Sequence, residues 1–438
     1  MVNISEERQL QSNTAEKAAL VRETYSTSEK QSAEAASKFS SDAKFFPGVG
    51  FKGAMRGLIL ILVASLTLVK PLLAASPATN ISPSVRPADD TQAVTVTVDT
   101  NSTKAVLSAV LSPGLTMVEA LRIAALSGNQ GLIRKARSYG RPGTDELFAK
   151  ALMAAAHHDD AAADPGKFHF GPVRDNAARI NATLAKLEDP ASNLLRSVKA
   201  RIAEFTPSSV SGHVTGYLIV GGTSGGFAFD EPEFFLNLDR FPSAALATTI
   251  MQHELFHAVQ GVARTSSNSS TADATCMAKI PHSKELSQLF ASLEMEGSAS
   301  LAGDVASMPA GIDEESDNAR KQARRNVDLV GRSITLLELS THGLNTGAQV
   351  SYGDIYALGF YGDEVLYALG YVMARAIAAE EGKSAIAELT GRPGALFVQR
   401  YRNLRSYGKS DTVPVLFAET LRSADQLAAC TNGVRNIR

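Results

Sequence analysis

The spacing of apolar residues changes character several times along the chain. Residues 1–50 are rich in Ser, Ala, Glu and Lys and carry no sustained apolar stripe, which is typical of an unfolded segment. Between residues 92 and 99, Val alternates with Thr, and this period predicts a half-buried strand. Apolar residues then recur at helical spacing up to residue 205, which predicts a helical N-terminal part over residues 92–205. Its clearest helices are expected at residues 117–126, 145–157, 175–188 and 190–205.

A cluster of turn residues at 206–209 begins a second part, residues 206–428. Short runs typical of strands follow it, separated by glycines and a proline, and they predict a small antiparallel sheet at residues 214–220, 226–230 and 233–238. Pro242 and Ser243 then open a long helix that extends to about Arg264, with Ser243 as its N-cap. Later helices are expected at residues 283–306, 318–340 and 363–381, with a helical tail ending near residue 427. The pattern predicts a predominantly helical α+β fold, with the small sheet preceding the long helix.

An apolar run at residues 57–69 stands between the polar leader and the folded part. Arg56 precedes it and small residues follow it up to residue 78, an arrangement typical of a secretory signal peptide. Its 13 residues are fewer than the roughly 20 that span a bilayer. We predict a cleaved signal at 55–78, with translation starting at Met55 and residues 1–54 not made. The alternative is a membrane anchor through residues 57–73. Both interpretations predict that the rest of the chain is exported, to the periplasm or the medium.

Composition narrows the classes of function. The net charge of −2 excludes a strongly basic nucleic-acid binder, so no nucleic-acid partner is expected. The 2 cysteines, Cys276 and Cys430, are too few for a disulfide-dense scaffold or a four-cysteine zinc site. A disulfide bond between these two cysteines is possible, and the sequence does not decide whether it forms.

The long helix after Pro242 contains the motif His253-Glu254-Leu255-Phe256-His257. Two imidazoles at positions i and i+4 share one helical face, so both can reach a single zinc ion. Glu254 lies beside them, placed to take a proton from a water on that ion. The pattern predicts zinc as cofactor and a hydrolytic reaction.

A catalytic zinc needs a third protein ligand besides an open position for water. A later helix offers Glu294 and Glu296. We favour Glu296, because the small residues Gly297 and Ala299 beside it permit a close approach between helices. Glu294 is the competitor, on a different face of the same helix.

The motif at 253–257, followed by Glu296-Gly297-x-Ala299, resembles the gluzincin metallopeptidases. In that superfamily the later glutamate is the third zinc ligand. The chain resembles more closely some uncharacterised bacterial families of zinc-dependent peptidases, over residues 93–405. The residues that carry this closer resemblance are Tyr367-x-x-Gly370-x-x-Met373, Gly382, Phe397 and Tyr401.

The resemblance implies a zincin-like catalytic unit that hydrolyses a peptide or protein substrate. Zinc held by the two histidines and Glu296 would acidify a water, and Glu254 would act as the general base. Tyr367 is our choice of donor to the oxyanion, with Tyr361 and Tyr371 as alternatives. The strand at 233–238 is expected to present its backbone to an extended peptide, as edge strands do.

Two other hypotheses remain. Gly222-Thr223-Ser224-Gly225-Gly226 matches the G-x-S-x-G pattern of serine hydrolases, but the sequence after it predicts a strand where that fold requires a helix. We therefore interpret the segment as a hairpin turn and consider a serine hydrolase using Ser224 the weakest hypothesis. The other hypothesis is an exported zincin-like protein with a weak or inactive site that acts by binding.

Overall fold

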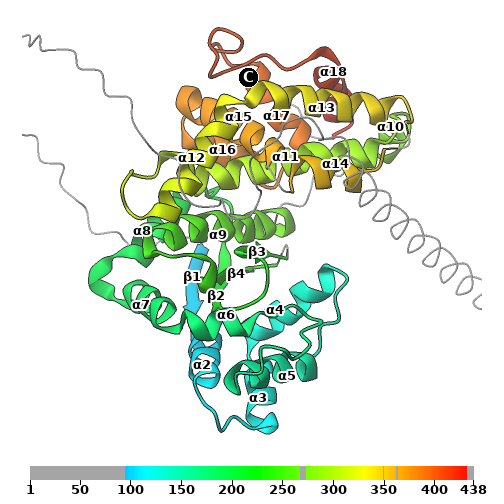
Figure 1. Cartoon of the computed structure of the whole chain (residues 1–438). Coiled ribbons are helices and arrows are strands. Elements are labelled where there is room, and N and C mark those ends of the chain that lie inside the picture. Colours follow the sequence, from blue (N-terminus) through cyan, green and yellow to red (C-terminus); the bar gives the residue numbers. More distant parts are fainter. Residues whose placement is uncertain (1–93, 230, 267–272, 349, 362–363, 432–438) are drawn as a thin grey trace, which may run out of the picture. The chain divides into compact units, whose positions relative to one another are not determined.

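The computed structural model describes residues 94–229, 231–266, 273–348, 350–361 and 364–431 (Figure 1). The predicted polar leader at 1–54 and the signal peptide or anchor at 55–78 lie outside these residues. Within the described part of the chain, no helix combines the length and the apolar character needed to cross a membrane.

Strand β1 (Val94–Asp99) opens the described chain and helices follow it. They are α2 (Asn101–Val110), α3 (Met117–Ala124), α4 (Ser127–Ser138), α5 (Asp145–Ala156), α6 (Phe170–Asp175), α7 (Ala177–Glu188) and α8 (Leu194–Ala203). The remaining strands come next: β2 (Gly212–Ile219), β3 (Gly226–Ala228) and β4 (Glu233–Asn237). The later helices are α9 (Ala244–Ser266), α10 (Ala274–Met277), α11 (Ser283–Ala302), α12 (Glu314–Asp328), α13 (Val330–Asn345), α14 (Tyr352–Gly359), α15 (Val365–Glu381), α16 (Lys383–Leu389), α17 (Gly394–Arg402) and α18 (Ala418–Ala429), with a short 3-10 turn, η3 (Val305–Ser307), between α11 and α12. The predicted class, a predominantly helical α+β fold, is confirmed.

The sheet is mixed, so the prediction of an antiparallel sheet is wrong in this detail. Its strand order is β1-β2-β4-β3; β1 and β4 both run parallel to β2, and only β3 is antiparallel to its neighbour β4. The reason is that the loop after β2 carries the chain past the position next to β2, which β4 then fills. Strand β4 is therefore paired on both sides, and β3, not β4, is the edge strand on its side of the sheet.

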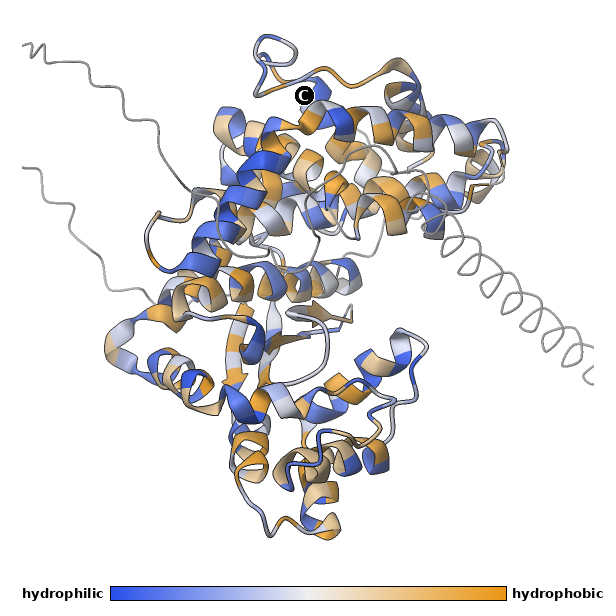
Figure 2. Ribbon diagram, viewed as in Figure 1, coloured by the Kyte–Doolittle hydropathy of each residue, from blue (hydrophilic) through white to orange (hydrophobic). Residues whose placement is uncertain are grey.

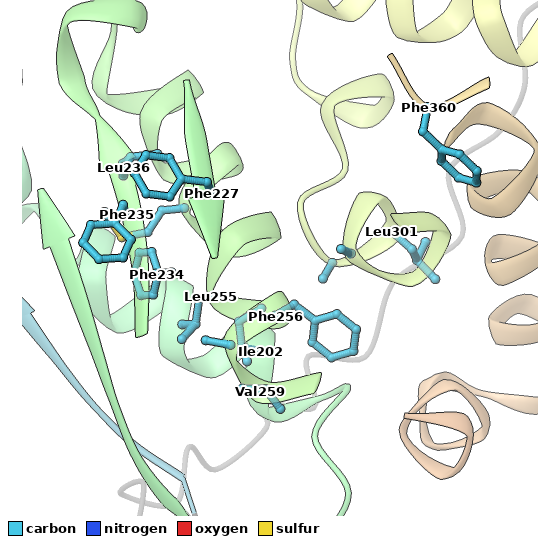
Figure 3. Close-up of a cluster of buried hydrophobic side chains, with 14 of the residues drawn as sticks. Ile202, Phe227, Phe234, Phe235, Leu236, Leu255, Phe256, Val259, Leu301 and Phe360 are labelled. Atoms are coloured by element: carbon cyan, nitrogen blue, oxygen red, sulfur yellow. The ribbon is translucent and has the colours of Figure 1, made fainter. Parts of the chain in front are cut away.

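Helix α9 covers one face of this sheet, and α2 and α4 lie against the other (Figure 1). Because successive residues of a strand point to opposite faces, β4 contributes to both layers. Phe235 packs on Gly131 of α4, where any larger side chain would collide with the ring. Figure 3 shows other buried side chains of the sheet and of α9, among them Phe234 and Leu255, gathered in one cluster.

Helices α11 and α15 cross at very close range in the second half of the chain. A Cβ added to Gly297 would collide with the backbone of Gly370, and one added to Gly370 would collide with the backbone of α11. Gly297 thus permits a close approach, as predicted, but its partner there is α15. Gly297 directly follows Glu296, so α15 packs against α11 beside this glutamate.

The helix predicted at 318–340 is two helices, α12 and α13. Asp313 caps the first by accepting a hydrogen bond from the backbone N–H of Ser316 at 2.8 Å. Leu329 separates them with a backbone that leaves helical geometry at φ −95° and ψ 18°. Figure 2 shows α12 as mostly hydrophilic, whereas α13 buries Ile334 and Leu337. Both helices contact α15, while α12 also packs on η3 and α13 also packs on α18.

The disulfide that the sequence left open is formed between Cys276 and Cys430. Their Cα atoms are 5.4 Å apart, and the bridge closes a loop of 154 residues. It ties α10 to the end of α18, and the backbone N–H of Asp273 donates to the carbonyl of Cys430 at 2.8 Å beside it.

Candidate metal centre

Helix α9 holds His253 and His257 one turn apart, with their Nε2 atoms 3.0 Å from each other. Ser243 fixes the start of the helix by accepting a hydrogen bond from the backbone N–H of Leu246 at 3.3 Å, so the predicted N-cap is confirmed. Leu255, on another face, is fully buried in the core. Capping and burial together orient the helix so that the two imidazoles point to the same place.

Helix α11 brings Glu296 to the two imidazoles. Its Oε2 lies 3.1 Å from Nε2 of His257 and 3.5 Å from Nε2 of His253. The side chain of Glu294 is buried as well, and the Ser298 hydroxyl donates to its Oε1 at 3.4 Å. Since residues two apart point to different sides of a helix, only one of these glutamates can join the histidines, and in the structure it is Glu296.

The three ligand atoms have the separations that zinc requires. Bonds of about 2.0–2.1 Å in tetrahedral geometry place neighbouring ligand atoms roughly 3.3–3.4 Å apart. The observed separations of 3.0, 3.1 and 3.5 Å bracket that value. Of the residues that the structure describes, His253, His257 and Glu296 form a group that could hold a metal ion. Two imidazoles and one carboxylate are a ligand set typical of catalytic zinc.

The charges of the cluster are coupled. Burial would raise the pKa of the Glu296 carboxyl, but the imidazoles of His257 and His253 outweigh burial and hold this pKa below its usual range. Burial would also lower the pKa of His257, yet Glu296 raises it to about 9. A metal ion must therefore displace a proton from this imidazole, so metal binding is expected to release protons.

Glu254 lies beside the cluster and is buried between α9 and β3. Burial raises its pKa, and the nearby imidazoles of His253 and His257 oppose that rise. A Cβ added to Gly226 of β3 would lie 2.5 Å from Oε1 of Glu254. The edge strand thus runs directly over this carboxyl, which is why glycine is needed at this position.

Of the three tyrosines considered as donors, Tyr367 is the one in ring contact with the cluster. Its ring stacks on that of His253, with centroids 6.2 Å apart and planes 15° from parallel. Burial raises its pKa well above the usual range, so the phenol stays protonated and can donate. Tyr371 is engaged elsewhere, donating to Asp304 at 2.9 Å, and Tyr361 is 61% exposed.

Gln260 is a residue of the site that the sequence-based prediction missed. It is fully buried, and its amide lies 2.8 Å from Nδ1 of His257 at one end. The Nε2 atom of the same amide lies 3.1 Å from the carbonyl oxygen of Met295 and 2.9 Å from the hydroxyl oxygen of Ser298, both on α11. A carbonyl can only accept, so the amide nitrogen faces Met295 and the amide oxygen faces His257.

This orientation determines the tautomer of the histidine. Nδ1 of the neutral His257 imidazole must carry the proton that the amide oxygen of Gln260 accepts. Nε2 then keeps its lone pair for a metal, as in other sites where a second group orients the ligand. The signal in the sequence is the spacing: a polar residue three positions after the second histidine lies on the same face of the helix.

A cleft beside the cluster has two halves that share His253, Glu254 and Tyr367 in their lining. One, of about 470 Å³, contains the three ligand side chains together with Lys135 of α4. The other, of about 480 Å³, extends past His253 and Glu254 between α9 and α12. Gly226 of the edge strand lines both halves.

Ser224 is not arranged as the nucleophile of a hydrolase. The strand β3 follows it, as predicted, so the helix that a nucleophile elbow requires is absent from this described segment. Its hydroxyl lies 2.9 Å from the phenol oxygen of Tyr139, which is not a general base.

The sequence matches the family described as "Putative zinc dependent peptidase (DUF5700)" over residues 121–409. All the residues of the candidate metal centre lie within that range. No curated protein and no solved structure matches the chain.

Proposed function

Because this chain belongs to the DUF5700 family of putative zinc dependent peptidases, we propose that it hydrolyses peptide bonds with a zinc-activated water. One observation carries the proposal: α9 and α11 bring His253, His257 and Glu296 together at ligand distances, with Glu254 beside them.

His253, His257 and Glu296 would hold zinc, which would supply a Lewis acid that lowers the pKa of a water molecule towards about 7. The carboxylate of Glu254 would accept a proton from a water molecule while the water oxygen adds to the carbonyl carbon of the substrate. Burial raises the pKa of Glu254, which helps this carboxyl group to retain the proton. Glu254 then delivers the proton to the leaving nitrogen as the C–N bond breaks, which gives the two products.

Tyr367 would donate a hydrogen bond to the carbonyl oxygen as negative charge develops on it; the stacking of its ring on His253 and its raised pKa support this role. The substrate can lie along β3, since an edge strand offers unpaired backbone groups to an extended peptide. This role falls to β3 rather than to β4, which is paired on both sides.

We also propose that the chain acts outside the cytoplasm. The disulfide between Cys276 and Cys430 supports this proposal, because such bonds persist in oxidising compartments and are rare in the cytosol.

The test is the variant Glu254→Gln, which keeps the shape of the side chain and removes its basicity. We expect zinc to stay bound and peptide hydrolysis to fall by about 10²–10⁴-fold. Glu285→Gln, in the first turn of α11, serves as the matched control and should retain turnover. Ser224→Ala should also retain turnover, whereas a chelator should abolish it. Full activity of Glu254→Gln would contradict the assigned role, and activity that survives complete zinc removal would contradict the proposed function.

A further inference from the structure

The half of the cleft beyond Glu254 is a cavity of about 480 Å³ whose lining is more apolar than polar. This volume lies within the range of small-molecule binding sites. The cavity exists because α12 presents Ala319 and Ala323, one turn apart, where larger side chains would fill it. Leu246 and Ile250 of α9 form part of the facing wall.

Polar side chains also line this cavity, and two of them, Tyr371 of α15 and Asn326 of α12, already have partners. Tyr371 donates to Asp304 at 2.9 Å. Asn326 accepts from Gln322 at 3.3 Å and from Arg332 at 2.8 Å. An apolar group can therefore cover Tyr371 and Asn326 without leaving them unsatisfied, which is the usual cost of covering polar atoms.

The position of the cavity ties it to the reaction. His253, Glu254 and Tyr367 line it, and the same three side chains line the half of the cleft that holds the metal ligands. Gly226 of the edge strand also lines both halves. A peptide lying along β3 with its scissile bond at Glu254 would direct a neighbouring side chain into the cavity.

We propose that this cavity is a specificity pocket for a large apolar side chain, such as Leu, Met or Phe, on a substrate residue that flanks the scissile bond. The proposal rests on the peptidase function proposed above and names its substrate class.

The experiment compares wild type with Ala323→Leu, which adds a side chain inside the cavity, and with Lys321→Leu as control. Lys321 is exposed on the same helix and does not line the cavity. Ala319→Leu is the second filling variant, should Ala323→Leu fail to fold. Each protein is tested on peptides that carry Phe, Leu or Ala on either side of one cleavable bond. Binding of acetyl-phenylalanine amide to the zinc-free proteins is measured separately by calorimetry.

Wild type and Lys321→Leu should prefer Phe or Leu over Ala at one flanking position by at least about 10-fold in kcat/KM. Ala323→Leu should lose at least about 10-fold on the large substrates and little on the Ala substrate. An unchanged preference in a folded filling variant overturns the proposal.

The binding measurement separates failure of the pocket from failure of the proposed function. If wild type cleaves no peptide, the peptidase function fails and the pocket is judged on binding alone. Tighter binding of acetyl-phenylalanine amide to wild type and Lys321→Leu than to Ala323→Leu, by about 10-fold, supports the pocket. Equal binding to all three proteins, or none, overturns it.

Discussion

Gln260→Met should weaken zinc binding although residue 260 touches no metal. The variant keeps the length and the burial of the side chain but loses the amide. Met295 and Ser298 keep other partners, since the hydroxyl of Ser298 also donates to the carbonyls of Met295 at 3.3 Å and of Glu294 at 2.7 Å. The Nδ1–H group of His257 therefore loses its protein partner, and the ring loses what orients it.

Loss of such an orienting group typically costs 10–100-fold in metal affinity. At about 1.4 kcal/mol for each factor of ten, this corresponds to about 1.4–2.8 kcal/mol. Competition for zinc with a chromophoric chelator measures the change directly, and thermal unfolding of the zinc-free protein tests whether the fold is retained. Gln260→Glu keeps an acceptor for Nδ1–H, so it should recover most of the affinity.

Gln252→Met is the matched control, because it makes the same substitution on α9 at a half-buried position. Its zinc affinity should equal that of wild type. Zinc affinity of Gln260→Met equal to that of wild type would refute the reasoning, and so would an equal loss in Gln252→Met.

Three further predictions follow from other parts of the structure. Gly226→Ala would place a Cβ 2.5 Å from Oε1 of Glu254. Turnover should therefore fall by about 10–100-fold while zinc content stays the same. Unchanged turnover would contradict this, because it would mean that β3 shifts to accommodate the methyl group. Cys276→Ser opens a loop of 154 residues, so the free energy of unfolding in urea should fall by about 2–5 kcal/mol, and no loss would indicate that the bridge does not form. A hydrogen bond from the Ser406 hydroxyl, with backbone donors beside it, lowers the pKa of Glu380 to about 2 from 4.5. Because this pKa is depressed in the fold, the stabilisation by the carboxylate is complete above pH 4.5 and is lost as the pH falls towards 2. Glu380→Gln should therefore be less stable than wild type at pH 7, with a gap that narrows in urea unfolding between pH 4.5 and pH 2; a constant gap would contradict this assignment.

Local spacing was enough to predict the features that a single helix determines. The N-cap at Ser243, the long helix after it and the placement of His253 and His257 on one face all depend on contacts within a few residues. Helix geometry repeats every 3.6 residues whatever surrounds it, so positions i and i+4 meet without help from the rest of the chain. The same locality explains why the segment around Ser224 could be interpreted as a turn that leads into a strand.

Features that join distant segments could not be obtained in that way. The sequence favoured Glu296 over Glu294, but the choice depends on which face of α11 turns towards α9, and packing against α15 at Gly370 helps to set that face. Strand pairing likewise depends on partners far along the chain, so the sheet was predicted antiparallel and the wrong strand was taken as its edge.

The amino-acid sequence alone thus specified the helical class, the motif of the metal centre and the kind of metal. The tertiary structure decided what surrounds them: the amide of Gln260 behind one histidine, β3 above Glu254 and the cavity beside it. The physical reason is that covalent geometry determines neighbours along a helix, whereas neighbours across the fold are selected by the burial and packing of many side chains at once.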